Sequence, residues 1–197
     1  MKKKIFIIAL VICVVVLSIA SVSTAYFTDV DEKTNTFTAG NVDIKFEGDV
    51  FVTLDDTTVY PSQKLGDSAK VLNVGSEDAF VGVIISFNKD IGGLEKVSAL
   101  FEGLVAQGTD YSVKYDSTSY KLYIVKNEKL VGQTGTATLF NSITIPATWD
   151  NAQMTAFNGV SITVKAYATQ TVGFATNDAE TALTTAFADW AAYSTLA

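Results

Sequence analysis

Residues 80–87 read FVGVIISF, a nearly continuous apolar run rich in β-branched side chains. A run of this length without polar alternation is typical of a strand that is covered on both faces. We therefore expect residues 80–87 to form a central strand of a sheet, with other elements packed on both sides of it.

Segments on either side of this run alternate instead, as half-buried strands do. In residues 42–46, Val42, Ile44 and Phe46 share one face, while Asp43 and Lys45 share the other. In residues 160–168 the predicted inward set is Val160, Ile162, Val164, Ala166 and Ala168, and the outward set is Ser161, Thr163, Lys165 and Tyr167. Further strands are expected at 51–54, 70–74, 111–115, 120–125 and 136–145, with a hairpin turn at 116–119.

Two segments change to helical periodicity. Apolar residues recur every three or four positions over 93–105, which predicts an amphipathic helix. A second helix is expected over about 178–191, because Asn177 and Glu180 have the spacing of a capping box and Trp190 continues its apolar stripe. Helices inserted among closely spaced strands favour a mainly β, antiparallel β-sandwich over a doubly wound fold.

Composition excludes several classes of function. The chain has 197 residues, enough for one domain, and a net charge of −7. It contains no arginine, which argues against nucleic-acid binding. It also contains no histidine, so Ser-His-Asp catalysis and histidine-ligated zinc are both excluded. We assign no catalytic residue, no metal ligand and no cofactor.

The N-terminus has the pattern of a secretory signal peptide. Lys2, Lys3 and Lys4 precede an apolar run over 5–20, and the small residues Ser23-Thr24-Ala25 follow it. We predict cleavage between Ala25 and Tyr26, with an uncleaved membrane anchor as the alternative. Cleavage removes three lysines and the single Cys13, changes the net charge from −7 to −10, and releases a secreted, extracellular or cell-surface protein.

The segment after the predicted cleavage point, YFTDVDEKTNTFT at 26–38, is rich in β-forming residues. It either forms the first strand of its own sheet or is donated to the sheet of a neighbouring subunit. The donor residues would be Tyr26, Phe27, Thr28, Asp29 and Val30. The predicted organisation is a signal peptide (1–25), a donor segment (26–36) and one sandwich domain (37–197).

Two motifs resemble a known family. Ala25 is followed by Tyr26-Phe27-Thr28-Asp29, then by Asn35-Thr36-Phe37-Thr38-Ala39-Gly40 and the strand at 42–46. The second motif is similar to a Pro-Gly-Asp loop followed by an Asn-x-Gly turn, and consists of Pro61, Gly66-Asp67 and Asn73-Val74-Gly75. It departs from that pattern in one respect, because Ser62 to Leu65 separate the proline from Gly66. Together these features resemble the TasA/camelysin family of secreted proteins, mainly over residues 1–90.

The resemblance implies a jelly-roll-like sandwich that polymerises into extracellular fibres of a biofilm matrix. It further implies processing by a SipW-type signal peptidase, donation of roughly Tyr26 to Thr36, and other copies or related matrix subunits as partners. A secreted monomeric binding module or adhesin is the alternative. The metallo-endopeptidase activity associated with the family is disfavoured by the missing histidine.

Other candidate sites have simpler interpretations. Carboxylates at Asp55-Asp56, Glu77-Asp78 and Asp29/Asp31/Glu32 could bind Ca²⁺ weakly, but they lack the spacing of a calcium loop and suit solvated turns. Asp116 and Glu128 have no recognisable glycosidase context. The tyrosines at 111, 115, 120 and 123 could form a strip for sugar contacts, although cross-strand packing explains them equally well. Trp149 and Trp190 are expected in or near the core.

Overall fold

The apolar run at 80–87 lies in the middle of a five-stranded antiparallel sheet, as predicted. The computed structural model describes residues 28–31, 42–48, 50–51, 59–172, 174 and 178–196, and the predicted signal peptide lies outside them. From one edge to the other, the strands are β1 (Thr28–Asp31), β11 (Ile162–Gln170), β5 (Ala79–Phe87), β8 (Lys121–Lys126) and β7 (Tyr111–Asp116).

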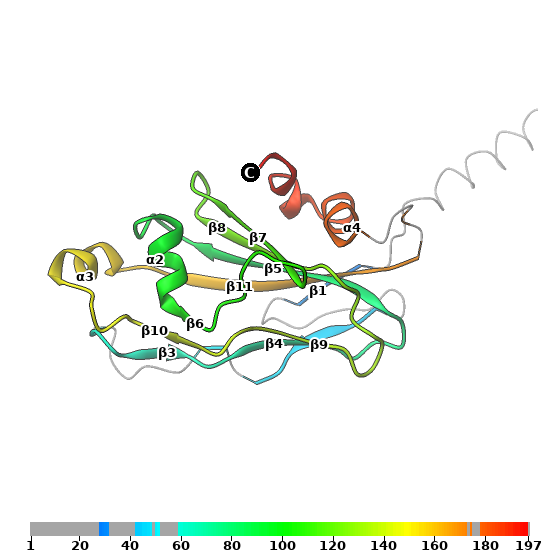
Figure 1. Cartoon of the computed structure of the whole chain (residues 1–197), viewed down its shortest axis with the longest axis horizontal. Helices are drawn as coiled ribbons and strands as arrows, with labels where there is room; N and C mark the ends of the chain where they lie inside the picture. The colour runs from blue at the N-terminus through cyan, green and yellow to red at the C-terminus, as the bar shows by residue number, and fades with distance from the viewer. Residues whose placement is uncertain are drawn as a thin grey trace, which may run out of the picture.

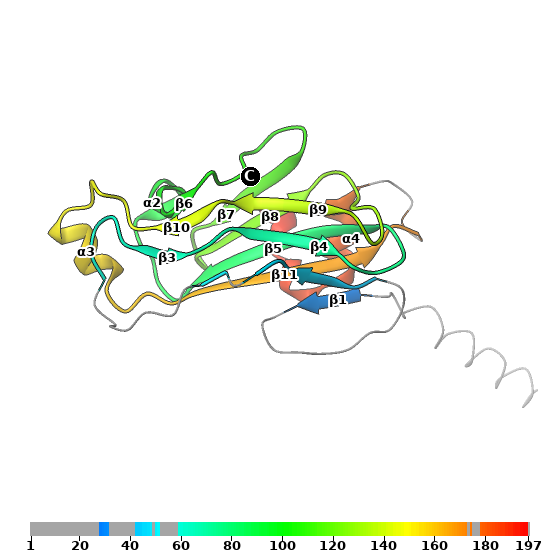
Figure 2. The ribbon, with the colours of Figure 1, turned by 90° about the horizontal axis from the view of Figure 1, so that it is seen from below.

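A second layer covers one face of this sheet (Figure 1). It consists of two three-stranded antiparallel sheets that follow one another along the long axis (Figure 2). One has the order β2 (Ile44–Phe46), β4 (Ala69–Asn73) and β9 (Thr136–Phe140), and the other has the order β3 (Lys64–Gly66), β10 (Ser142–Thr144) and β6 (Phe101–Glu102). The predicted mainly β, antiparallel sandwich is therefore confirmed.

Alternate residues of β5 supply the two cores. Val81, Val83, Ile85 and Phe87 face the second layer, where the main core lies. Phe80 and Ile84 face the opposite side, where they pack beneath the C-terminal segment. Both faces of β5 are thus buried, which is why its sequence lacks the polar alternation of a surface strand.

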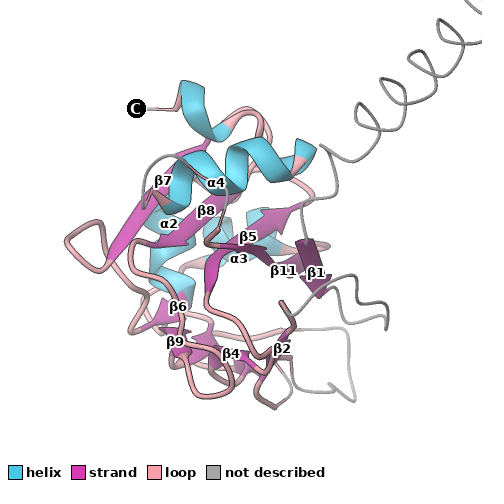
Figure 3. Cartoon of the chain, turned by 90° about the vertical axis from the view of Figure 1, so that its right-hand side faces the viewer, coloured by secondary structure: helices cyan, strands magenta, loops and turns pink. Residues whose placement is uncertain are grey.

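The C-terminal segment forms a third layer on the outer face of the five-stranded sheet (Figure 3). The predicted helix over 178–191 is shorter: α4 (Ala179–Ala186) ends where Phe187 takes an extended conformation, and the turns η1 (Ala188–Trp190) and η2 (Tyr193–Thr195) follow. Asp178 caps α4 by accepting hydrogen bonds from the amides of Glu180 and Thr181. The expected cap, Asn177, lies outside the described residues.

This third layer corrects the predicted orientation of β11. Tyr167 was expected to face solvent, but it is 2 % exposed and lies under Phe187 and Trp190, with ring centroids at 5.1 and 5.8 Å. The inward residues Val164, Ala166 and Ala168 are buried in the main core as predicted.

Three local predictions also change. The helix over 93–105 is only α2 (Gly93–Leu100), because Phe101 and Glu102 pair with β10 as β6. The strand over 136–145 divides into β9 and β10 at Asn141, whose amide donates to the Glu102 carbonyl at 2.7 Å. A helix that was not predicted, α3 (Asn151–Phe157), begins with a capping box between Asp150 and Gln153. Of the strand predicted at 51–54, only Phe51 is described, in a bridge to Gly66.

Candidate functional site

The predicted donor segment contributes the edge strand β1. Thr28 is aligned with Thr169 of β11, and Asp31 is aligned with Ala166, in an antiparallel pair within the same chain. Thr28, Asp29 and Val30 of the predicted donor therefore lie in β1, whereas Ala25, Tyr26 and Phe27 lie outside the described residues. The arrangement within one chain is thus the first of the two alternatives, and donation to a neighbour remains a prediction.

The pairing of β1 is short compared with that of its neighbour. β1 aligns four residues with β11, while the other side of β11 aligns all nine of its residues with β5. Because β11 is anchored independently along its whole length, removal of β1 would leave the remaining strands of the sheet paired. Without β1, the edge of β11 would present unpaired main-chain groups.

The Asn73-Val74-Gly75 motif forms a turn around a buried amide. Asn73 is 1 % exposed, and its Oδ1 accepts the amide hydrogen of Gly75 at 3.1 Å. Its Nδ2 donates to the carbonyls of Glu77 at 2.8 Å and Leu130 at 3.0 Å. The side chain thereby satisfies its buried polar atoms and ties the turn to the loop that follows β8.

The same turn holds the point at which the N-terminal segment joins the domain. The amides of Val74 and Gly75 both donate to the carbonyl of Asp43, at 2.8 and 3.0 Å. Ile44, the first residue of β2, is aligned with Asn73 itself. The motif therefore fixes residue 43 on the sandwich, so that the chain preceding it starts from a defined position.

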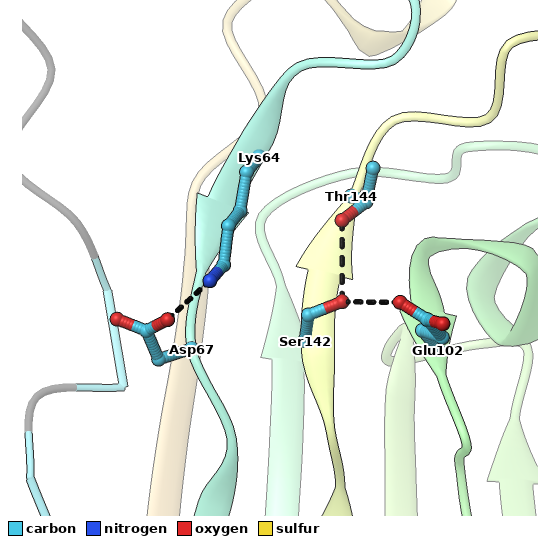
Figure 4. Close-up of polar contacts among 5 residues, drawn as sticks. All are labelled: Lys64, Asp67, Glu102, Ser142 and Thr144. Atoms are coloured by element: carbon cyan, nitrogen blue, oxygen red, sulfur yellow. Dashed lines mark hydrogen bonds and ion pairs between the residues drawn. The ribbon is translucent and has the colours of Figure 1, made fainter.

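The Pro61 and Gly66-Asp67 parts of the motif have a separate structural role. Pro61 opens the turn before β3, where the amide of Ser62 donates to the Ile145 carbonyl at 2.8 Å. At Gly66, a Cβ would lie 2.2 Å from the Val50 carbonyl oxygen, so only glycine fits. Asp67 forms an ion pair with Lys64 (Figure 4). Gly66 pairs with Ile143 in one three-stranded sheet, whereas Asn73 pairs with Ile44 in the other, so the structure does not bring the two halves of the motif into one site.

A hydroxyl and carboxylate cluster that the sequence did not indicate lies on the same layer. Ser142 Oγ donates to Glu102 Oε2 at 2.9 Å and lies 3.2 Å from Thr144 Oγ1 (Figure 4). These contacts join β10 to β6. They could not be foreseen, because Glu102 and Ser142 are 40 positions apart and match no motif.

Two of the acidic candidates, Asp78 and Asp116, serve as structural carboxylates. Asp78 accepts hydrogen bonds from Lys129 Nζ at 2.6 Å and from the amide of Gly132 at 3.1 Å, and both contacts lower its pKa. Asp116 accepts from Ser119 Oγ and the amide of Thr118, which lowers its pKa and closes the predicted hairpin turn. Among the described residues, no three or more carboxylate, cysteine or histidine side chains form a group that could hold a metal ion. Asp55, Asp56 and Glu32 lie outside these residues.

The aromatic candidates pack in the cores and do not form one exposed strip. Tyr123 is 1 % exposed and packs on Trp190 and Tyr193 in the outer core, with centroids at 5.4 and 5.8 Å. The other three tyrosines of the predicted strip, at 111, 115 and 120, pack partly buried against the main core. Trp149 is buried against Phe157, as expected for a core residue.

No helix in the described part of the chain combines the length and apolar character needed to cross a membrane.

Comparison with known proteins gives one family match. Residues 1–91 match the family described as camelysin metallo-endopeptidase. No curated protein and no solved structure matches the chain.

A metal-dependent peptidase requires nitrogen or oxygen ligands gathered at one place, and catalytic zinc sites use histidine. This chain has no histidine, and its described residues hold no suitable group, so the donor set does not fit a catalytic zinc ion. The matched region nevertheless contains both motifs on which the sequence resemblance rests. Over its first 91 residues, this chain thus matches the camelysin family, in the region where the sequence resemblance to the TasA/camelysin family lies.

Proposed function

We propose that this protein is a secreted structural subunit of extracellular fibres, which assembles head to tail by N-terminal strand donation after its signal peptide is removed. The observation that carries the proposal is the position of β1: it is an N-terminal edge strand, and among the described strands it pairs with β11 alone. Such a strand can move to a second subunit without breaking any other strand pairing of the sheet.

Exchange of β1 between subunits conserves its interactions. A neighbour's β1 would align with Ala166 to Thr169 as the chain's own β1 does, so the main-chain hydrogen bonds are the same within and between chains. Each such bond contributes about 1 kcal/mol net. The balance between monomer and fibre then depends on the segment that connects β1 to Asp43 and on the protein concentration.

Strand exchange of this kind produces an open chain of subunits. Each copy uses its N-terminal segment as donor and its β11 edge as acceptor, so the contact joins two different surfaces. A heterologous contact that does not close into a ring extends into a filament. The turn at Asn73 to Gly75 supports this geometry, because it holds residue 43 while the preceding chain reaches across to the neighbour.

Removal of residues 1–25 is the step that allows assembly to begin. While the apolar segment remains in the membrane, β1 is tethered close to it and cannot reach a second subunit. Cleavage before Tyr26 frees the segment.

Electron microscopy of two purified proteins, 26–197 and 37–197, tests the proposal. We expect filaments from 26–197 and monomers from 37–197. Val30→Pro in 26–197 is the matched control: it keeps the length and charge of the segment but cannot donate a hydrogen bond within a strand, so we expect few or no filaments. Filaments from 37–197 would contradict strand donation. A monomeric 26–197 would contradict fibre formation and favour the binding-module alternative.

The proposal also states that the protein is not an enzyme. Purified 26–197, incubated with casein and added Zn²⁺, is expected to leave the casein intact. Cleavage that requires the metal and stops on addition of a chelator would overturn this part of the proposal.

A further inference from the structure

The five-stranded sheet has a second edge, formed by β7. An edge strand presents unpaired N–H and C=O groups to which another strand can add. In β7 the groups of Tyr111 and Val113 are turned away from β8: the Val113 amide donates to Gln107 Oε1 at 2.6 Å, and the Tyr111 carbonyl accepts the amide hydrogen of Gly108 at 2.8 Å. Residues 107–110, here named the edge cap, therefore occupy two successive positions that an added strand would need.

The edge cap is fastened to the neighbouring strand. Asn127, directly after β8, donates from Nδ2 to the carbonyls of Gly108 at 3.1 Å and Thr109 at 2.9 Å. Its main-chain amide donates to the Asp110 carbonyl at 3.0 Å, and its Oδ1 accepts from Ser112 Oγ at 2.8 Å. Three hydrogen bonds donated by Asn127 thus hold the cap, and the bond accepted from Ser112 orients its side chain, so the position of the cap does not depend on Gln107 alone.

The uncapped part of β7 is short. After Val113, only Lys114 and Tyr115 precede Asp116, whose carboxylate closes the hairpin turn. Two residues are fewer than the four that β1 aligns with β11, and fewer than the about five or six of a strand of ordinary length. The cap therefore occupies the part of β7 with which an added strand would form its hydrogen bonds.

We propose that the edge cap closes β7 to strand addition, so that a neighbouring copy can join the five-stranded sheet only at the β11 edge. This inference rests on the proposed function in one respect, the unbranched growth of a fibre. The closure of β7 itself is a property of the single chain and holds whether or not fibres form. Its consequence for assembly is that the five-stranded sheet of each subunit accepts one donor strand, at the β11 edge.

The first test measures the cap directly in 26–197, with the variants Gln107→Ala and Gln107→Glu. Gln107→Ala removes the acceptor of the Val113 amide, and we expect this amide to exchange with deuterium roughly fivefold faster, the factor that corresponds to one ordinary hydrogen bond. Gln107→Glu retains an acceptor oxygen in the same place and is expected to preserve the protection. Equal exchange at Val113 in all three proteins would overturn the role of Gln107.

The second test measures association, using Gln107→Ala combined with Asn127→Ala to remove the side-chain hydrogen bonds that these two residues contribute to the cap. We expect branched or laterally joined filaments from this variant of 26–197, and dimers by sedimentation from the same variant of 37–197, in which β1 is absent. Unaltered filaments and a monomeric 37–197 variant, with circular dichroism showing a folded protein, would overturn closure by the cap. Absence of filaments in the unmodified 26–197 bears on the proposed function alone, because dimerisation of the 37–197 variant would still show that β7 had been opened.

Discussion

The indole of Trp190 lies directly on the main chain of Gly82. A Cβ placed at Gly82 would lie 2.5 Å from both Cζ2 and Cη2 of Trp190, far inside van der Waals contact, and 2.6 Å from Leu183 Cδ1. Trp190 is completely buried. Because Gly82 has no side chain, the indole of Trp190 can pack against the central strand and hold the C-terminal layer on the sheet.

Gly82→Ala should therefore destabilise the protein by overpacking. We expect the free energy of unfolding to fall by about 1–3 kcal/mol, because the indole or the strand must shift to admit a methyl group. Urea denaturation monitored by tryptophan fluorescence measures the effect. Gly108→Ala is the control, since the nearest atom to its added Cβ would be 3.9 Å away, and it should be close to neutral. Equal stability of both variants would show that Trp190 is not seated against Gly82.

Tyr193 should make the protein sensitive to alkaline pH. Its side-chain hydroxyl is buried without a hydrogen-bond partner among the described residues, and burial together with the nearby Glu180 carboxylate raises its pKa well above the usual value. In the unfolded chain, a tyrosine ionises near pH 10. Above that pH the unfolded state releases a proton that the folded state retains, so the free energy of unfolding falls as the pH rises.

Tyr193→Phe removes the contribution of this hydroxyl to the pH dependence of stability. We expect its stability at pH 7 to equal or exceed that of the unmodified protein, because a buried hydroxyl without a partner is lost. Between pH 10 and 12, the free energy of unfolding of the variant should fall less steeply than that of the unmodified protein. The difference between the two slopes should be up to about 1.4 kcal/mol per pH unit. Tyr60→Phe, at a tyrosine that is 59 % exposed, is the control. An identical alkaline slope for Tyr193→Phe and the unmodified protein would contradict the prediction.

Asn73→Asp should loosen the turn that holds Asp43. The substituted oxygen would face the carbonyl oxygens of Glu77 and Leu130, to which the amide group of Asn73 donates. We expect a loss of about 1–3 kcal/mol at pH 7, and a smaller loss at pH 4, where the new carboxyl group can be protonated and donate. Thermal unfolding at the two pH values measures both effects. Asn158→Asp, at an exposed asparagine, should change little at either pH.

A pair of cysteines can distinguish pairing within a chain from pairing between chains. Asp29 and Ala168 are aligned partners in β1 and β11, and protein beginning at Tyr26 contains no other cysteine. For Asp29→Cys combined with Ala168→Cys, oxidation of the monomer should give an internal disulfide and prevent filament growth until a reductant is added. Oxidation after assembly should instead give a ladder of covalent oligomers on a non-reducing gel.

The two single-cysteine variants are the controls, and neither should form a ladder. If oxidised filaments of the double variant yielded only monomers, β1 would remain paired with its own β11 in the fibre. That outcome would contradict exchange of the strand while leaving fibre formation itself intact.

Much of the strand content could be predicted because it depends on local pattern. The apolar run at 80–87, the alternation at 42–46 and the hairpin around Asp116 each record how a segment meets water and its immediate neighbours. The helix Asn151–Phe157 was missed although Asp150 and Gln153 carry a capping-box signal, because its seven residues are too few to establish a helical period. The helix over 93–105 was predicted too long, since its last apolar residues pair with a distant strand.

The candidate site likewise has features that a local sequence pattern could predict and features that it could not. The extended character of residues 28–31 could be predicted from composition, while a domain boundary near residue 37 stays a prediction. Its alignment with β11, more than 130 positions further on, has no local signal. Neither does the contact between Gln107 and Val113, because a side-chain amide that closes a strand edge leaves no periodicity.

By itself, the sequence determined that this chain builds a mainly β sandwich, and it predicted a signal peptide followed by an unassigned β-segment. Only the tertiary structure decided which edge that segment occupies, which edge is closed, and why Tyr167 is buried. The physical reason is that hydrophobic periodicity records whether a residue meets water or apolar neighbours, whereas edges and covering layers are created by segments that meet only after folding.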